Sequence, residues 1–112
     1  MKTKIVLMTL MLFLLTFMAR AGGNDTLKVM TSAVCGECKE IIEKYLSFEK
    51  GVESSDLDVK SKVLTVVYNP KKTDAQKIRL AVTKSGYDAD SLKADPKAFR
   101  KLPECCKRPH GE

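Results

Sequence analysis

Thr31–Lys39 reads TSAVCGECK and places two thiols, Cys35 and Cys38, three residues apart. Before this stretch, residues 27–31 alternate in the manner of a strand. After it, apolar side chains recur at intervals of three and four residues, which predicts a helix from about Glu37 to Phe48. Two thiols at such a junction can bind one soft metal ion or form a disulfide, and the rest of the chain favours one of these uses.

Two further runs, Val52–Val59 and Val63–Tyr68, have the composition and alternation of strands. Only residues 60–62 separate them, so we expect an antiparallel hairpin. Asn69 and Pro70 end the second run, because proline cannot continue the ladder of backbone hydrogen bonds.

A second helix follows the hairpin. Thr73 and Gln76 have the spacing of a capping box, with Thr73 as the N-cap. Gly86 is expected to end the helix as its left-handed C′ residue, and Tyr87–Leu92 is expected to form the last strand. The order strand, helix, strand, strand, helix, strand predicts an α+β ferredoxin-like βαββαβ sandwich. Such a fold has a four-stranded antiparallel sheet with both helices on one face.

Residues 22–92 account for this domain, and residues 93–112 form a short C-terminal extension. Asp95 and Pro96 are expected to begin a short helix that runs through Lys101. Pro103 ends it, and we expect the remaining tail to be irregular.

Residues 1–21 have the pattern of a signal peptide. Two lysines near the N-terminus precede an apolar run over residues 5–18. Ala19-Arg20-Ala21 fits the small-x-small cleavage rule, so we expect cleavage after Ala21. The apolar run is short for a bilayer span, which needs about 20 apolar residues. We therefore expect a periplasmic or secreted protein without stable membrane insertion after cleavage.

The charge balance argues against nucleic acid as a partner. The chain has 20 Lys and Arg against 14 Asp and Glu, but the leader holds three of the basic residues and no acidic one. The remainder carries 17 basic against 14 acidic residues, a net charge of +3, and shows no basic stripe interleaved with aromatic residues. We expect a monomeric single domain.

All four cysteines follow the leader, and export would place them in an oxidising compartment. They form two local pairs, at positions 35 and 38 and at positions 105 and 106. Disulfides within such pairs would close very short loops and would restrain the unfolded chain little. The cysteines are therefore expected to serve chemistry more than stability.

Over residues 26–90 the chain resembles a heavy-metal-associated domain. This family includes small copper chaperones, the N-terminal domains of copper-pumping ATPases and exported mercury-binding proteins. The resemblance depends on C-x-x-C between the first strand and the first helix, on the βαββαβ order, and on Ser85-Gly86-Tyr87 after the second helix. The leader and the single-domain length are most similar to the exported mercury-binding members.

The resemblance implies roles for three residues. Cys35 and Cys38 match the two metal-binding thiolates of the family, and Tyr87 matches an aromatic residue that bacterial members place beside the metal loop. Ser32 and Ala33 stand where the family usually has Gly and Met, and the Met packs under the loop. The ligands are thus retained, while the support of the loop differs.

The residues alone also favour metal binding. The unpaired N–H groups and the dipole at a helix N-terminus favour negative charge, so both thiols should be rich in thiolate and partly exposed. Lys39 and Glu37 are nearby charges of opposite sign whose effects should partly cancel. Two soft thiolates suit Cu(I) or Hg(II), whereas Zn(II) and Cd(II) are further possibilities and structural zinc normally takes four ligands.

Two other uses of Cys35 and Cys38 stay open. Thioredoxin-like proteins present Cys-Gly-x-Cys at a helix start for thiol–disulfide exchange, but this chain is short for that fold and has no tryptophan. A metal-responsive sensor or adaptor domain would instead use metal binding to change its contacts with a partner.

The tail carries a second constellation, Cys105-Cys106-x-x-x-His110. These residues could form an auxiliary metal site, or fold back and complete a three- or four-coordinate site with Cys35 and Cys38. The alternative is an accessible tail with exposed thiols or a disulfide between the two neighbouring cysteines. Taken together, we expect an exported metallochaperone, not an enzyme, that exchanges a soft metal ion with a membrane transporter or efflux component.

Overall fold

The computed structural model describes residues 23–107. The expected signal peptide, its cleavage site after Ala21 and the candidate ligand His110 lie outside the described residues. Within residues 23–107, no helix has both the length and the apolar character needed to cross a membrane.

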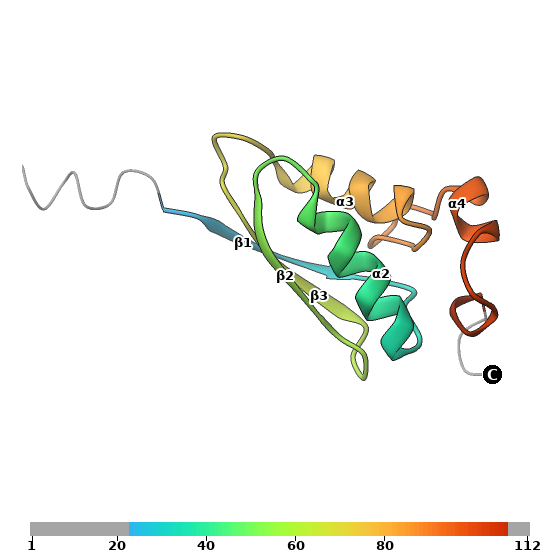
Figure 1. Ribbon diagram of the computed structural model, residues 1–112. Coiled ribbons are helices and arrows are strands. Elements are labelled where there is room, and N and C mark those ends of the chain that lie inside the picture. The colour runs from blue at the N-terminus through green and yellow to red at the C-terminus, as the bar shows by residue number, and fades with distance from the viewer. Residues whose placement is uncertain (1–22, 108–112) are drawn as a thin grey trace, which may run out of the picture.

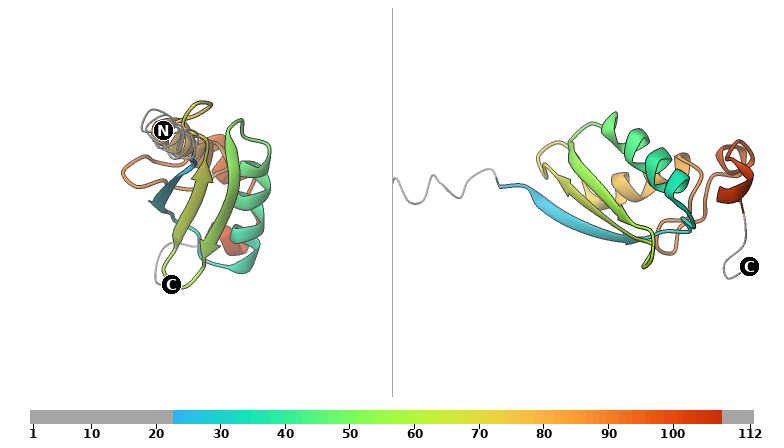
Figure 2. Two further views of the ribbon diagram at one scale, coloured as in Figure 1. Left: turned by 90° about the vertical axis from the view of Figure 1, so that its left-hand side faces the viewer. Right: turned by 60° about the horizontal axis from the view of Figure 1, so that its bottom comes forward.

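Two layers make up the domain. Strands β1 (Asp25–Met30), β2 (Val52–Asp58) and β3 (Val63–Tyr68) form an antiparallel sheet in the order β1-β3-β2. Helices α2 (Gly36–Ser47) and α3 (Ala75–Lys84) lie together on one face of this sheet (Figures 1 and 2). The predicted α+β class, with two helices on an antiparallel sheet, is confirmed.

The strand register directs apolar side chains toward the helices. Leu64 on the central strand β3 lies opposite Val29 on β1 and Leu57 on β2, and all three are buried. Because successive side chains of a strand point to opposite faces, Val66 joins Leu64 on the buried face. The core consists of Val29, Ala33, Cys38, Ile42, Leu46, Leu57, Leu64, Val66, Ile78, Ala81, Val82, Tyr87, Ala89, Leu102 and Cys106.

The predicted hairpin between β2 and β3 is present. Asp58 and Val63 are paired at its end, and the Lys62 N–H donates to the Asp58 carbonyl at 2.7 Å. Lys62 has a φ of 65°, which reverses the chain before β3 begins. β2 therefore ends at Asp58, one residue earlier than the alternation of side chains indicates.

The fourth strand expected at Tyr87–Leu92 does not form among residues 23–107. Ala89 makes only isolated bridges, one to Thr31 beyond the end of β1 and one to Leu92. Asp90 then adopts a φ of 52°, and its side chain accepts a hydrogen bond from the Met30 N–H at 2.9 Å. Because this carboxylate replaces a backbone carbonyl and the chain turns there, the segment cannot continue beside β1, and the sheet has three strands.

The expected N-cap of α3 is also corrected. Asp74, not Thr73, precedes the helix, and its carboxylate accepts a hydrogen bond from the Lys77 N–H at 2.9 Å. Thr73 is buried, and its own N–H donates to the Asn69 carbonyl in the preceding turn. The turn thus holds Thr73 in place and leaves the capping role to the next residue, which is an equally good N-cap type.

The end of α3 confirms the role predicted for Gly86. Its φ is 111°, its N–H donates to the Thr83 carbonyl, and the Tyr87 N–H donates to the Val82 carbonyl. This pair of bonds is a Schellman motif. Leu102 packs so closely on Gly86 that a Cβ at position 86 would lie 3.1 Å from three of its atoms.

We predict that Gly86→Ala lowers the free energy of unfolding by about 1–3 kcal/mol, because a side chain at positive φ is strained and its Cβ presses on Leu102. Urea unfolding followed by circular dichroism measures this. Gly36→Ala is the matched control, since Gly36 is helical and a Cβ there meets nothing within 4 Å. Equal stability of the two variants would contradict the prediction.

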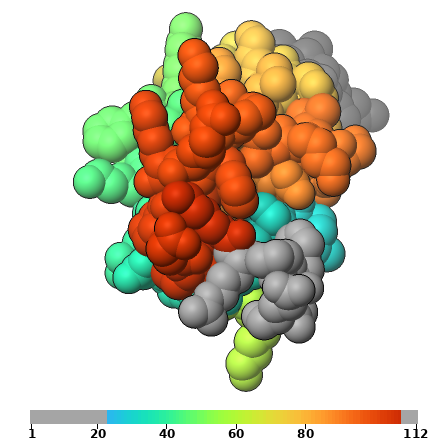
Figure 3. All heavy atoms as spheres, turned by 90° about the vertical axis from the view of Figure 1, so that its right-hand side faces the viewer, coloured from blue at the N-terminus to red at the C-terminus, as the bar shows by residue number. Residues whose placement is uncertain are grey.

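The C-terminal extension is ordered against the domain. Helix α4 (Pro96–Arg100) begins as predicted, with the Asp95 carboxylate accepting from the Ala98 N–H. In the described part of the tail, which was expected to be irregular after Pro103, residues Glu104–Cys106 form a short 3₁₀ helix, η1. Figure 3 shows the extension covering one end of the molecule, next to the start of α2.

Candidate metal centre

The start of α2 positions the predicted pair of thiols. Cys35 is the N-cap residue with an extended backbone, and Cys38 is the third residue of the helix. Their sulfur atoms lie 3.3 Å apart. The structure thus places both cysteines as the sequence predicts, one before the helix and one in its first turn.

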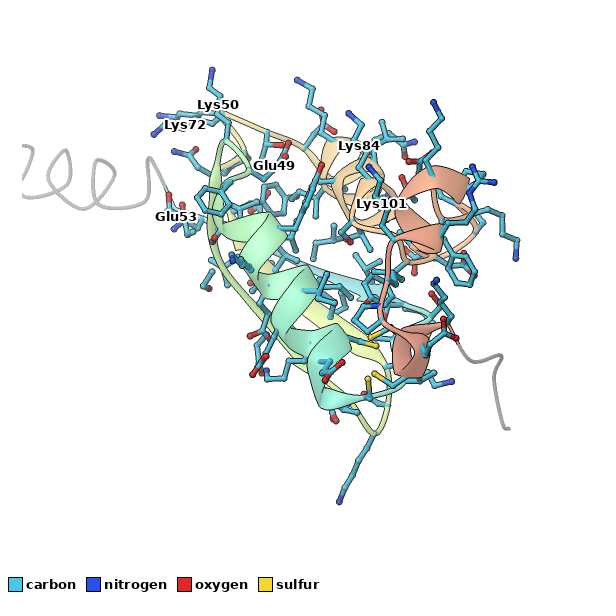
Figure 4. The ribbon with its side chains drawn as sticks, turned by 45° about the vertical axis from the view of Figure 1, so that its right-hand side comes forward. Glu49, Lys50, Glu53, Lys72, Lys84 and Lys101 are labelled. Atoms are coloured by element: carbon cyan, nitrogen blue, oxygen red, sulfur yellow. The ribbon has the colours of Figure 1, made fainter. Side chains whose placement is uncertain are left out.

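The C-terminal extension brings the other two cysteines to the same place. Cys105 Sγ lies 3.2 Å from Cys35 Sγ, and Cys106 Sγ lies 3.6 Å from it. The sulfur atoms of Cys35, Cys105 and Cys106 all lie within 4.8 Å of one another. Figure 4 shows the sulfur atoms gathered between the start of α2 and the C-terminal extension. The structure thus favours the folded-back tail over the accessible one.

Burial divides the four cysteines into two pairs. Cys38 and Cys106 are buried, whereas Cys35 and Cys105 are partly exposed. The expectation that Cys38 is partly exposed is therefore wrong. Its side chain lies on the apolar face of α2 together with Ile42, and this face is covered by the sheet and the extension. Access to the sulfur cluster is through Cys35 and Cys105.

Cys35 is the thiol that ionises most readily among those with shifted pKa values. Burial raises its pKa, but the Cys105 thiol and the backbone N–H and thiol of Cys38 stabilise the thiolate more strongly and lower the pKa from 9.0 to about 7. The Glu37 carboxylate, which accepts a hydrogen bond from Cys105 Sγ at 3.1 Å, raises the pKa of Cys105 to about 11. Burial and the neighbouring Cys38 raise the pKa of Cys106.

We predict that one thiol of the reduced protein titrates near pH 7. At that pH about half of Cys35 is thiolate, whereas about 1% of a thiol with a pKa of 9.0 is ionised. Iodoacetamide alkylation rates, measured from pH 5 to 10 with peptide mapping, report this for each cysteine. Cys35 should react fastest at neutral pH and Cys105 should lag behind it. A Cys35 midpoint near pH 9 would contradict the expectation.

The charges near the site do not cancel as expected. The Lys39 ammonium group is held by Glu43 at 2.6 Å and by Asp56 at 2.7 Å, and it also donates to the Leu57 carbonyl. Glu37, in contrast, contacts the Cys105 thiol directly. The charged side chain in contact with the cluster is therefore an acidic one.

Tyr87 lies beside the cluster, as the family pattern implies. It is 1% exposed, and its hydroxyl has no hydrogen-bond partner among the described residues. Burial raises its pKa, and the adjoining Cys106 and Cys38 side chains add to the rise. Tyr87 therefore belongs to the core and also lies directly against the sulfur cluster.

The loop before Cys35 is supported differently from the Gly-Met pattern. Ala33 is fully buried, and its N–H donates to the Thr31 hydroxyl at 3.2 Å. The Ser32 hydroxyl accepts from the Asp88 N–H at 2.9 Å, which ties the loop to the segment after Tyr87. Polar contacts therefore hold this loop.

Sequence reasoning missed one residue that shapes the site, Leu102, and one contact, that of Glu37 with Cys105. Leu102 packs the extension onto Gly86, and Glu37 contacts Cys105. The isolated leucine between Lys101 and Pro103 was the available signal for the first. No signal in the sequence indicated the contact of Glu37 with Cys105, because it joins residues 68 positions apart.

Part of the chain matches the model of a known protein family. The model of the heavy-metal-associated domain matches residues 28–88, which include Cys35, Cys38 and Tyr87 but not Cys105 or Cys106. A copper-exporting P-type ATPase of Staphylococcus aureus strain JH9 is 35% identical over 60 residues, which is 54% of this chain and 8% of that protein. The chain therefore spans less than a tenth of this relative's length.

Solved structures agree on the fold. A CopZ metallochaperone has a TM-score of 0.56 and 26% identity, over 58% of this chain and 98% of that one. Oxidized MerP from Ralstonia metallidurans CH34 has a TM-score of 0.51 and 26% identity, over 59% and 96%. The N-terminal domain of the zinc(II) ATPase ziaa in its apo form has a TM-score of 0.52 and 30% identity, over 80% of each chain.

Proposed function

Because the chain belongs to the heavy-metal-associated domain family, we propose that it binds one soft metal ion through Cys35 and Cys38 and passes the ion on by ligand exchange. The observation that carries this proposal is the contact of the two sulfur atoms, 3.3 Å apart, at the N-terminus of α2. Both residues lie within the part of the chain that the family model matches.

The donor set decides which ions are suitable. Thiolates are soft ligands that select Cu(I), Hg(II) and, with more ligands, Zn(II) or Cd(II). The helix N-terminus favours the negative charge of the thiolates, and the pKa of Cys35, about 7, makes this ligand available at neutral pH. The ion is cargo in this proposal and no covalent bond of a substrate is broken.

The exposure of the two cysteines indicates the side from which another protein can approach the ion. Cys35 is partly exposed and Cys38 is buried. A thiolate of a donor or acceptor can therefore approach the ion from the side of Cys35, while Cys38 keeps hold of it from the core. The ion moves when the incoming sulfur binds and a sulfur of this site releases it.

The partner that we propose is a membrane metal transporter or efflux component, and the site of action is the periplasm or the cell exterior. The similarity to part of a copper-exporting ATPase supports the class of partner, and the leader pattern of residues 1–21 supports export. We further propose that the protein acts as a monomer.

Equilibrium dialysis of the reduced protein against Cu(I) or Hg(II) tests the proposal. The wild type should bind one ion per chain, and the double variant Cys35→Ser/Cys38→Ser should lose this binding. Ser54→Ala, on the exposed part of β2, is a control that should bind as the wild type does. Tight stoichiometric binding by the double cysteine variant would refute the assignment.

Thiol–disulfide exchange is the second candidate function. The observation that favours it is the combination of a Cys35 pKa of about 7 with a sulfur neighbour at 3.3 Å, because a thiolate fraction near one half is well suited to exchange. A redox protein should reduce insulin disulfides catalytically in the absence of metal. A metal carrier should bind the ion stoichiometrically and show no such turnover.

A further inference from the structure

We propose that Cys35, Cys105 and Cys106 form a three-thiolate site for a soft divalent ion such as Hg(II) or Cd(II), closed by the C-terminal extension. This inference rests on the proposed function and specifies the coordination of the ion. The family model ends at residue 88, so the extension supplies two sulfur atoms beyond the matched domain.

The three sulfur atoms form a nearly regular triangle. The distance from Cys35 Sγ to Cys105 Sγ is 3.2 Å, that from Cys35 Sγ to Cys106 Sγ is 3.6 Å, and that from Cys105 Sγ to Cys106 Sγ is 3.7 Å. Each sulfur is thus in contact with both others. An ion on the axis of this triangle can reach all three thiolates at once.

These distances fit a bent arrangement of ligands better than a linear one. Two sulfur atoms bound linearly to one ion at about 2.3 Å, the zinc–sulfur distance, lie about 4.6 Å apart, whereas the 120° angle of a planar three-ligand site brings them to about 4.0 Å. The sides of the triangle approach the second value. Three-thiolate binding therefore requires only small movements of these side chains.

The core of the domain holds the extension in this position. Leu102 is 7% exposed and packs against Gly86 at the end of α3. Cys106 is 3% exposed and belongs to the core cluster, and the Asp95 N–H donates to the Thr83 carbonyl at 2.9 Å. Since α3, α4 and η1 are all anchored, Cys105 and Cys106 reach Cys35 through tertiary packing and not as part of a loose tail.

Charge selects between monovalent and divalent ions. Three thiolates carry three negative charges, so a monovalent ion leaves a net charge of −2 at the site and a divalent ion leaves −1. The Glu37 carboxylate touches Cys105 and adds further negative potential. Because excess charge of one sign is unfavourable in a partly buried site, this arrangement favours the divalent ion, and binding releases the protons that the three sulfur atoms still hold.

Cys38 has a separate role in this arrangement. It contacts Cys35 at 3.3 Å but does not belong to the triangle of three mutually close sulfur atoms. A pair formed by Cys35 and Cys38 can receive or release an ion when the extension moves aside, and the triangle retains the ion when the extension is docked. Cys35 is common to both arrangements.

X-ray absorption spectroscopy with Cd(II) alone as the probe counts the sulfur ligands and tests the proposal. The wild type should show at least three, Cys38→Ser should keep three, and Cys105→Ser/Cys106→Ser should fall to two. The affinity of that double variant for Cd(II) should fall by more than about 100-fold, since the loss of an outer-sphere partner alone costs 10- to 100-fold. Its Cu(I) affinity should change less than tenfold.

Leu102→Ala provides a variant that keeps every thiol. It removes the packing that docks the extension, so its Cd(II) affinity should fall at least tenfold while circular dichroism shows a folded domain. An unchanged sulfur count and Cd(II) affinity in Cys105→Ser/Cys106→Ser would overturn the inference and leave the function of Cys35 and Cys38 intact. Failure of the wild type to bind either Cd(II) or Cu(I) would overturn both.

Discussion

Cys35→Ser should lower the affinity for a soft metal ion more than any other single cysteine replacement. Cys35 Sγ contacts all three other sulfur atoms, at 3.3 Å to Cys38, 3.2 Å to Cys105 and 3.6 Å to Cys106. A hydroxyl is a hard, weakly acidic ligand, so serine cannot replace the thiolate. We expect the affinity to fall by more than about 100-fold, because this ligand serves both arrangements of the site.

Competition with a chromophoric chelator measures this loss under reducing conditions. Cys38→Ser is the matched control, since Cys38 lies outside the triangle of Cys35, Cys105 and Cys106, and its loss leaves these three thiols in place. Its affinity should fall less than that of Cys35→Ser. Equal affinities of Cys35→Ser and the wild type would show that the ion is not bound in this cluster.

Tyr87→Ala should produce the largest loss of stability outside the cysteines. Tyr87 is the largest of the fully buried side chains and lies between the core and the sulfur cluster. Truncation of a buried aromatic ring costs about 3–5 kcal/mol, which is a large part of the 5–15 kcal/mol that stabilises a typical domain. Urea unfolding of the reduced apo protein should show this loss.

Tyr87→Phe separates the ring from its hydroxyl. The hydroxyl has no hydrogen-bond partner among the described residues, and a buried polar group without a partner costs about 1–3 kcal/mol. The phenylalanine variant should therefore be as stable as the wild type or more stable. A large loss of stability in Tyr87→Phe would show that the hydroxyl makes an essential contact and would refute this account of the residue.

Local patterns in the sequence predicted most of the fold and the first half of the site. The periodicity around Cys35 and Cys38 fixed the junction of strand and helix, and Gly86 marked the end of α3 as the structure has it. These features depend on residues that are close in the sequence and on the backbone preference of a single glycine, so the sequence alone indicates them.

Two errors in the fold arose where another contact competed with the local pattern. The pattern of Tyr87–Leu92 does not reveal that the Asp90 carboxylate takes the Met30 N–H and turns the chain. In the same way, two adjacent residues could cap α3, and the turn that engages Thr73 decided in favour of Asp74. A tertiary contact settles the first competition and a local turn settles the second.

The sequence could propose Cys105 and Cys106 as ligands but could not predict that they lie beside Cys35. The residue types of Cys105 and Cys106 indicate potential ligands, yet the position of these residues depends on the packing of Leu102 against Gly86. That contact joins the extension to the end of α3 and has no local signature. The sequence therefore showed which residues can bind a soft ion, while their convergence on Cys35 required the structure.

Native mass spectrometry of the reduced protein, offered Cu(I), Hg(II) and Zn(II) in competition, tests the central claim most directly. The account predicts one soft ion per chain in the wild type and none in Cys35→Ser/Cys38→Ser at the same concentrations. A wild-type protein that stays free of metal, or a double variant that retains one ion per chain, would contradict the claim that these thiols bind the metal.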